Sequence, residues 1–307
     1  MRRNYDVLVI ESLEELRAIA AEWDALWRGD ANATPFQSPH WLLPWWEHFG
    51  SGELAVIAHR DGGVLRALVP LYVLREDDES LGMLIGTGIS DYLDAIGNAD
   101  DLLAPLASID CQLWDLQQLR PSSPLLTAPS ALSSNIDQQD ACPVVALAGI
   151  KPRKNLDYYR RHANATYEAA TSANLDELLS ALFSLHAARW ESRGLPGVLG
   201  DPVTQDFHRD VARRMLAAGA LRMYAMRVEA RIIAIFYGFA HAGTTYYYLG
   251  GHDPAHDKLS AGTLVVAHAI GEAVRKGQTT FDFLRGAEEY KYAWGATDRM
   301  NRRRQLS

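Results

Sequence analysis

Apolar residues recur along the first half of the chain with two different periods. Continuous or alternating apolar runs, which are typical of strands, occupy residues 5–10, 53–60 and 64–74. The triplet Asp61-Gly62-Gly63 between the last two runs predicts a hairpin turn. Helical spacing follows Ser12, which forms a capping box with Glu15, and a second helix is predicted over 38–50 with a kink at Pro44.

The second half shows a longer succession of elements. Two helices, over 174–193 and 204–217, come before three strand-like segments, which are 220–228, 231–240 and 243–250. An apolar helix over 260–276, which Ser260 is predicted to cap, a strand over 279–284 and a short helix over 287–294 follow. This order predicts a three-stranded meander and then a strand–helix–strand crossover, and hence a mixed sheet flanked by helices.

Length and charge suggest that the chain has two parts. Its 307 residues correspond to about two domains of ~150 residues each. Residues 1–150 carry 8 Lys and Arg against 22 Asp and Glu, whereas residues 151–307 carry 22 against 16. We therefore predict domains over 1–150 and 151–307, with residues 118–140 as a loop rich in Ser, Pro and Gln. The basic half suits a phosphorylated cofactor, or its excess arginines only solubilise a surface.

Several protein classes are excluded by composition. No apolar run reaches the ~20 residues that cross a bilayer, and no apolar stretch follows Arg2-Arg3, so we expect neither stable membrane insertion nor a signal peptide. The net charge of −8 and the absence of a basic run interleaved with aromatic residues argue against nucleic acid. Only two cysteines, Cys111 and Cys142, are present, which cannot form a disulfide framework and fits the reducing cytoplasm. Both lie in apolar, strand-like contexts, so neither is predicted to be an activated nucleophile.

Candidate chemistry first gathers around a strand that ends in a glycine pair. In YYYLGGHDPAHDKLSAG, residues 246–262, a polar loop joins this strand to Ser260-Ala261-Gly262 at a helix start. Backbone N–H groups at such a start bind phosphate, although an ordinary capped turn has the same pattern. The two His-Asp doublets at 252–253 and 256–257 are more typical of a polar loop than of a metal site, and we expect no metal.

A second concentration of titratable groups follows the last predicted strand, in FDFLRGAEEYKYAWG over 281–295. The acids Asp282 and Glu288, together with Arg285, Tyr290 and Lys291, come close together in the sequence at the end of that strand. Such a cluster suits a ligand site. Alternatively, the charged residues form the solvated face of a short helix whose buried face holds the aromatic residues.

These motifs together resemble a known family. LHAARWESRG, IIAIFYGF, YYYLGGHDP, LSAGTLVVAHAIGEAVRKG and FDFLRGAEEYKYAWG are similar to the BioF2-like acetyltransferase domain of the GNAT superfamily, which includes CelD-type proteins of cellulose and exopolysaccharide production. ATPFQSPHWLLPWWEHFG extends the resemblance to the first half. The relatives include FemABX-type aminoacyl transferases. The resemblance implies an α/β fold of two GNAT-like halves, each a mixed, mostly antiparallel sheet flanked by helices.

The resemblance also implies an acyl-CoA co-substrate and roles for individual residues. The acyl-CoA arm would enter between strands 243–250 and 279–284, although K-L-S-A-G replaces the usual phosphate loop of the superfamily. The cofactor-binding candidates are Leu249, Gly250, Gly251, Lys258, Ser260, Ala261, Gly262, Thr263 and Arg285. Asp282 or Glu288 would act as the base, Tyr290 as the acid that protonates the leaving thiolate, and Lys291 as a positive charge for the intermediate.

The acceptor is expected to be a polar metabolite or a saccharide, with the first half as one wall of its site. The candidate contacts are Asp91, Tyr92 and Trp190. For Trp41 and Trp45, which are four residues apart on one helix, a place in the core is favoured. The main hypothesis is an acyl-CoA-dependent acyltransferase. The alternatives are a FemABX-like aminoacyl transferase and a catalytically degenerate scaffold protein.

Overall fold

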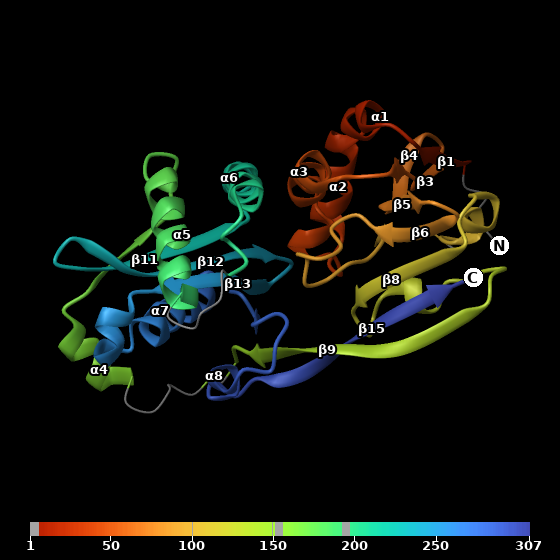
Figure 1. Ribbon diagram of the computed structural model, residues 1–307. Coiled ribbons are helices and arrows are strands. Elements are labelled where there is room, and N and C mark those ends of the chain that lie inside the picture. Colours follow the sequence, from red (N-terminus) through yellow and green to blue (C-terminus); the bar gives the residue numbers. More distant parts are fainter. Residues whose placement is uncertain (1–5, 100, 149, 151–155, 192–196) are drawn as a thin grey trace. The chain divides into compact units, whose positions relative to one another are not determined.

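The computed structural model describes residues 6–307 except 100, 149, 151–155 and 192–196 (Figure 1). The chain divides into two compact units, Met1–Ala141 with Arg299–Ser307, and Cys142–Asp298. The predicted mixed α/β fold with helices flanking sheets is confirmed. The sequence analysis divided the chain once, at residue 150. The two units do not follow that division, because the end of the chain belongs with the first unit.

Unit 1 contains two sheets. The first has the strand order β1-β3-β4-β7 and is antiparallel throughout. In the second, the order is β2-β5-β6-β8-β15-β9, and β6 and β8 are parallel. The strands are β1 Asp6–Ile10, β2 Glu53–Leu54, β3 Val56–Asp61, β4 Val64–Val69, β5 Leu71–Glu76, β6 Glu79–Leu84, β7 Ile96–Gly97, β8 Leu113–Leu119, β9 Ser134–Ala146 and β15 Thr297–Leu306.

Unit 1 contains six helices among its described residues, namely α1 Leu13–Ala18, α2 Ala20–Gly29, η1 Pro35–Gln37, α3 Pro39–Phe49, η2 Ala104–Ser108 and η3 Pro124–Leu126. Of these, α1 and α3 begin where the sequence predicts. The Ser12 side chain accepts the N–H of Glu15, as the capping box requires. In α3, Trp41 and Trp45 are buried, which confirms their predicted place in the core.

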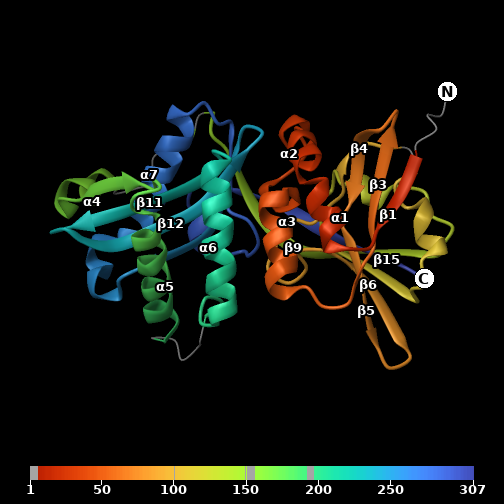
Figure 2. The same cartoon turned by 90° about the horizontal axis from the view of Figure 1, so that it is seen from above.

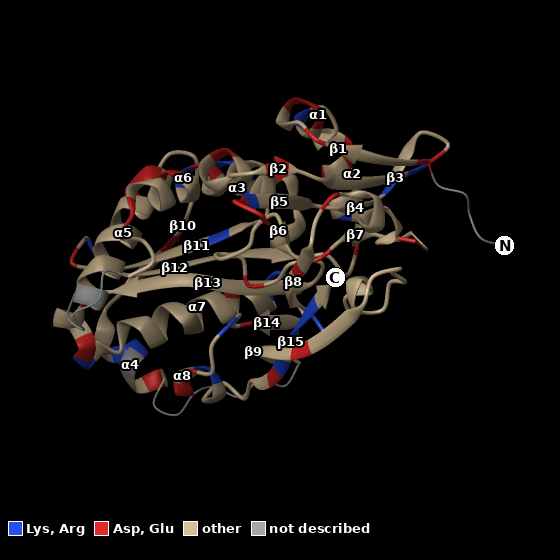
Figure 3. Cartoon of the chain, turned by 45° about the vertical axis from the view of Figure 1, so that its right-hand side comes forward, with Lys and Arg blue, Asp and Glu red and all other residues tan. Residues whose placement is uncertain are grey.

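The last strand of the chain was not predicted, and it changes the interpretation of the charges. β15 carries four arginines between residues 299 and 304, and basic segments of this strand are blue in Figure 3. Arg303 binds both oxygens of Asp115 at 2.5 and 2.8 Å. Counted by unit, unit 1 holds 12 Lys and Arg against 22 Asp and Glu, and unit 2 holds 18 against 16. Four of the basic residues of the second half therefore belong to unit 1, and unit 2 is left with a net charge of only +2.

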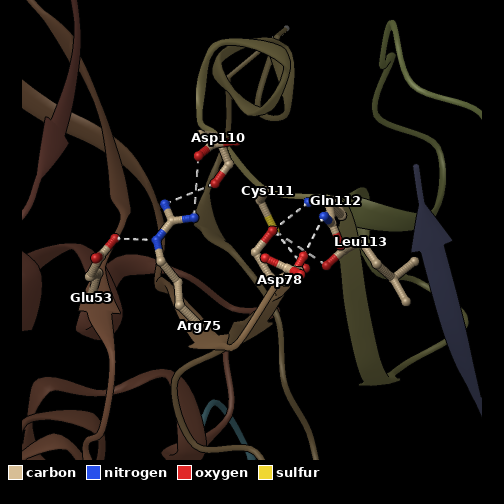
Figure 4. A network of polar contacts seen from close by, with 8 residues as sticks. Glu53, Arg75, Asp78, Asp110, Cys111, Gln112 and Leu113 are labelled. Carbon is tan, nitrogen blue, oxygen red and sulfur yellow. Dashed lines mark hydrogen bonds and ion pairs between the residues drawn. The ribbon is translucent and has the colours of Figure 1, made fainter.

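Cys111 lies in a network that joins the ends of strands in unit 1 (Figure 4). Its thiol donates to the carbonyl of Leu113 at 3.3 Å, while Arg75 binds Glu53 and Asp110. Burial raises the pKa of the Cys111 thiol, so the thiol stays protonated at neutral pH. This agrees with the prediction that Cys111 is not an activated nucleophile.

Unit 2 is built on one sheet with the order β10-β11-β12-β13-β14-β9. Its strands are β10 Thr166–Ala169, β11 Leu221–Val228, β12 Arg231–His241, β13 Thr244–His252 and β14 Thr280–Asp282, and the end of β9 completes it. Its helices are α4 Leu156–Ala163, α5 Leu175–Glu191, α6 Pro202–Ala217, η4 Pro254–Leu259, α7 Ala261–Arg275 and α8 Glu289–Tyr292. The predicted meander and crossover are both present.

Helices cover both faces of the unit 2 sheet. Figures 1 and 2 show α5 and α6 on one face and α7 on the other. The apolar stripe of α7 packs against aromatic residues of the sheet, among them Phe236 and Phe281, both completely buried. Because α7 is anchored in this way, its first turn lies at a fixed place beside the end of β13.

Two local predictions are wrong. Ser260 occupies the N-cap position of α7, but it has a left-handed backbone (φ 52°) and its side chain makes no capping hydrogen bond. Residues 118–140 are not all loop, because β9 begins at Ser134. The first residues of β9 are polar and exposed, so hydrophobic pattern alone does not reveal them as a strand.

Candidate active site

The two strands predicted to separate around an acyl donor pair only at their beginnings. Thr244, Thr245 and Tyr246 of β13 lie opposite Thr280, Phe281 and Asp282 of β14 in parallel register. β14 ends at Asp282, whereas β13 continues for six more residues to His252. The sheet therefore opens between these strands beyond Tyr246.

The glycine pair of β13 lies in this opening and permits close packing on both sides. A Cβ at Gly251 would approach Leu185 Cβ of α5 to 2.8 Å, and a Cβ at Gly250 would lie 2.3 Å from the Tyr247 hydroxyl. On the other side of β13, the pairing with β12 shifts register, since Tyr237 lies opposite Leu249 and Gly238 opposite Tyr247. Such a bulge changes the direction of the backbone locally.

A cavity of about 210 Å³ is bounded by the open part of β13, the first turns of α7 and the region of α8. The residues that line it are Ile235, Tyr247, Gly250, Gly251, His252, Gly262, Thr263, Val265, Val266, Tyr290 and Trp294. Five of the predicted site residues, namely Gly250, Gly251, Gly262, Thr263 and Tyr290, are thus brought together. The cavity is smaller than the ~300–1,000 Å³ usual for a whole drug-sized ligand, so it suits one end of a larger molecule.

His252 also lines this cavity, although the sequence analysis did not name it as a catalytic candidate. Its Nε2 lies 3.4 Å from Asp257 Oδ1, and its Nδ1 faces the start of α7, where a Cβ at Gly262 would approach it to 3.2 Å. Gly262 therefore makes room for the imidazole. A histidine that contacts a carboxylate at one ring nitrogen is oriented for proton transfer at the other. The available signal was a histidine at a strand end followed by an aspartate five residues later.

Tyr290 is the one proposed catalytic residue that lines the cavity. It belongs to α8 and is partly buried against the core, with its ring 6.3 Å from the ring of Phe283 in an edge-to-face arrangement. Trp294, one helical turn later, lines the cavity beside it. The alternative expectation was that the aromatic residues of this segment are buried. Tyr290 and Trp294 do pack against the core, and they also line the cavity.

Asp282 has a structural contact at the end of β14. Its side chain is completely buried, and its Oδ1 accepts the N–H of Leu284 at 2.8 Å. Leu284 has a left-handed backbone (φ 59°), which is unfavourable for a branched residue. The Asp282 carboxylate therefore stabilises the turn after β14, and it does not line the cavity.

Lys291 holds the same turn from the other side. Its ammonium, on a side chain only 3% exposed, donates to the carbonyls of Arg285 at 2.7 Å and Gly286 at 3.0 Å and lies 2.8 Å from Glu288 Oε2. The carbonyl of Leu284 lies 3.4 Å from the same nitrogen, so the three donors of the ammonium are all used. Glu288 is largely exposed, and neither it nor Lys291 lines the cavity. The backbone of the predicted cofactor residue Arg285 is thus part of the structure that holds Lys291.

The remaining cofactor candidates lie around the cavity rather than in it. Lys258 is exposed on η4, Ser260 joins η4 to α7, and Ala261 is buried in the core. Leu249 lies in β13 opposite Tyr237. Within the segment 258–263, only Gly262 and Thr263 therefore line the cavity.

The acceptor candidates fall outside this cavity. Tyr92 is completely buried in unit 1, between the Phe36 ring and the Arg120 guanidinium. Asp91 is 8% exposed, and its carbonyl accepts a hydrogen bond from Asn301 of β15. Both residues are therefore held within unit 1. The side chain of Trp190 lies outside the described residues.

Two features are absent from the described residues. No helix among them is long and apolar enough to cross a membrane. No group of three His, Cys, Asp or Glu side chains among them comes together as a metal site would require.

Comparison with known proteins shows that part of the chain is similar to one family. Residues 151–292 match the family described as Acetyltransferase (GNAT) domain. These residues include all of the described cavity lining up to Tyr290. No curated protein matches the sequence of the chain. The GNAT match covers less than half of the chain and so applies to the second unit.

Solved structures resemble the chain over nearly its whole length. FemX has a TM-score of 0.68 at 10% identity, over 97% of this chain and 96% of that one. The C-terminal domain (DUF2156) of a putative lysylphosphatidylglycerol synthetase from Agrobacterium fabrum has a TM-score of 0.63 at 10% identity, over 96% and 92%. A tandem GNAT protein from the clavulanic acid biosynthesis pathway has a TM-score of 0.50 at 11% identity, over 98% of both chains. The fold is therefore that of two GNAT-like halves.

The packing of the glycine pair leads to a stability prediction. Replacing Gly251 with alanine is expected to lower the free energy of unfolding by about 1–3 kcal/mol, because the new Cβ would force β13 away from α5. In Gly271→Ala, the Cβ meets nothing within 4 Å inside α7, so a gain of about 0.5–1 kcal/mol is expected. Urea denaturation of both variants checks this, and equal stability of the two would contradict the packing argument.

Proposed function

We propose that the chain is a GNAT-type acyltransferase that binds its acyl donor between β13 and β14. The observation that supports this most is the position of the cavity, which lies where β13 continues beyond its pairing with β14. A thioester arm entering there would reach the start of α7, whose N–H groups favour negative charge. The finer assignment to BioF2-like, CelD-type enzymes rests on the sequence motifs.

Acyl transfer to an amine or hydroxyl requires a base, an oxyanion donor and an acid. His252, oriented by Asp257, is the base in this proposal because it lines the cavity and contacts a carboxylate. The Tyr290 hydroxyl donates a proton to the leaving thiolate. Backbone N–H groups near Gly250 and Gly251 hold the oxyanion. Asp282, Glu288 and Lys291 then fix the turn that carries Tyr290, and Arg285 belongs to that turn.

Acyl-CoA is the donor that we favour. The cavity is lined by apolar and aromatic residues together with Thr263 and His252, which suits an acyl group and the end of its thioester arm. Lys258 and Ser260, which precede α7, would lie near the pyrophosphate. The acceptor in this proposal is a polar metabolite or a saccharide, with a link to exopolysaccharide or cellulose production. An acyl-CoA donor also implies a cytoplasmic reaction.

A second candidate is an aminoacyl transferase. It is favoured by the similarity of the whole chain to FemX and to a domain of a putative lysylphosphatidylglycerol synthetase. The net charge of +2 on unit 2 gives little electrostatic attraction for a tRNA, which counts against this candidate.

The donor proposal is tested by thermal melting of the full chain with acetyl-CoA. At a ligand concentration 100 times its Kd, binding adds about 2.7 kcal/mol of stability. In Thr263→Trp, the indole would fill the cavity, and the shift in Tm is expected to disappear. Val274→Trp, on the exposed end of the same helix, is the matched control and should keep the shift. A shift that survives in Thr263→Trp would contradict binding in this cavity.

The two donor classes are separated by the choice of ligand. A stable aminoacyl-adenosine analogue is expected to leave the Tm unchanged if acyl-CoA is the donor. A shift with this analogue and none with acetyl-CoA would replace the main proposal by the aminoacyl transferase. The absence of a shift with either ligand would favour a scaffold protein.

A further inference from the structure

Unit 1 contains a cavity larger than the one in unit 2. It measures about 620 Å³, and all the described residues that line it belong to unit 1. The end of α2, strands β4 and β7, and the loop before η3 form its walls, and its polar lining includes Asp30, Asn32, Arg66, Asp94 and Arg120. This volume lies within the ~300–1,000 Å³ typical of small-molecule sites.

Asp94 presents one carboxylate oxygen that takes no part in the fold. Its Oδ1 accepts the N–H of Ala95 at 2.8 Å and the hydroxyl of Ser123 at 2.7 Å, whereas Oδ2 accepts no hydrogen bond in the described part of the chain. The residue is 5% exposed and lines the cavity. Burial raises the pKa of Asp94 to about 7, against the opposing effect of the Arg120 charge.

Arg120 lines the same cavity and has a hydrogen-bond donor without an acceptor among the described residues. Its guanidinium packs over the Tyr92 ring at 5.7 Å and donates one hydrogen bond to the carbonyl of Asn32. Its Nε is buried and has no acceptor among the described residues. A buried donor without a partner is unfavourable until a ligand or water supplies an acceptor.

The other charged groups of the cavity have partners within the protein. Asp30 accepts the N–H groups of Asn32 at 2.8 Å and Gly97 at 2.9 Å, so it shapes the loop after α2. Arg66 lies 3.9 Å from Asp61 and is about half exposed. Asp94 and Arg120 are therefore the pair whose open groups are buried, whereas Arg66 is about half exposed to solvent.

We propose that this cavity binds a small zwitterion, an amino acid or a short peptide, with its ammonium at Asp94 Oδ2 and its carboxylate at the Arg120 guanidinium. Guanidinium and carboxylate form strong charge-assisted hydrogen bonds, and each end of such a ligand satisfies one open group of the protein. None of the described lining residues is aromatic, which disfavours a sugar stacked on a flat ring. The site is independent of acyl transfer in unit 2.

Isothermal titration calorimetry of the full chain with alanyl-alanine tests the proposal at pH 7. Binding is expected, and it should weaken at least tenfold when the dipeptide is N-acetylated or C-amidated. Asp94→Asn and Arg120→Gln should each weaken binding of the free dipeptide at least tenfold, whereas the exposed Asp110→Asn and Arg28→Gln should not. The capped ligands test the proposal on the unaltered chain, even where a variant folds poorly.

The pH dependence gives a second readout. Because the ammonium binds only ionised Asp94, binding should release a proton at pH 6 and strengthen roughly 25-fold between pH 5.5 and 7.5. Asp30, Arg66 and Arg120 are the other charged groups around it, and Asp94→Asn should abolish the dependence. No binding of alanyl-alanine at millimolar concentration, equal binding of the capped dipeptides, or preferred binding of a neutral disaccharide would each overturn the proposal.

Discussion

Replacing His252 with glutamine is expected to lower turnover about 10²–10⁴-fold, the usual contribution of general acid–base catalysis. Glutamine keeps a polar side chain beside Asp257 but cannot accept and carry a proton. The affinity for the acyl donor should change little, because the donor contacts proposed here come mainly from β13 and α7. Release of CoA thiol from acetyl-CoA, with water or a panel of amines as acceptor, measures the turnover.

His256→Gln is the matched control for this experiment. His256 lies four residues further on in η4, contacts Asp253 at 3.1 Å and is not recorded in the cavity lining. Its replacement should leave turnover within about twofold of the unaltered chain. Equal loss in both variants would indicate a structural effect on η4, and full activity of His252→Gln would remove His252 from the mechanism.

The fold of unit 2 could be predicted because its elements bury apolar residues in regular patterns. The stripe of α7 and the aromatic strands β12 and β13 follow the periods of helix and strand. β15 could not be predicted in this way, since it is rich in arginine. It is held by partners such as Asp115, which is 188 residues away from Arg303 in the sequence. Pattern analysis of a single sequence has no access to such pairings.

In the candidate site too, local sequence patterns predicted some features, whereas contacts formed only on folding decided others. The strand that ends in two glycines and the helix start at Gly262 were predicted, and the structure brings them to one cavity. Sequence proximity also grouped Asp282, Glu288 and Lys291 with Tyr290, but burial and hydrogen bonding separate them from the cavity. His252 was missed because a histidine at a strand end has no distinctive pattern until α7 and α8 are folded against β13.

Replacing Lys291 with methionine is expected to destabilise unit 2 by about 2–4 kcal/mol. Methionine fills a similar volume, but the carbonyls of Arg285 and Gly286 lose their charged donor, and an unsatisfied buried acceptor costs about 1–3 kcal/mol. For a domain of this size, the fall in Tm is roughly 5–10 °C. Thermal melting followed by circular dichroism measures it.

Two comparisons distinguish this structural role from a catalytic one. Glu288→Gln retains an oxygen that can accept from Lys291 on an exposed side chain, so its effect should stay within about 1 kcal/mol. Lys258→Met, at an exposed lysine of η4, should leave the Tm unchanged. If Lys291→Met melts at the temperature of the unaltered chain and yet loses activity, the ammonium acts on the reaction and its assignment to the turn after β14 is wrong. A lower Tm together with loss of activity in proportion to the unfolded fraction is the result that we expect.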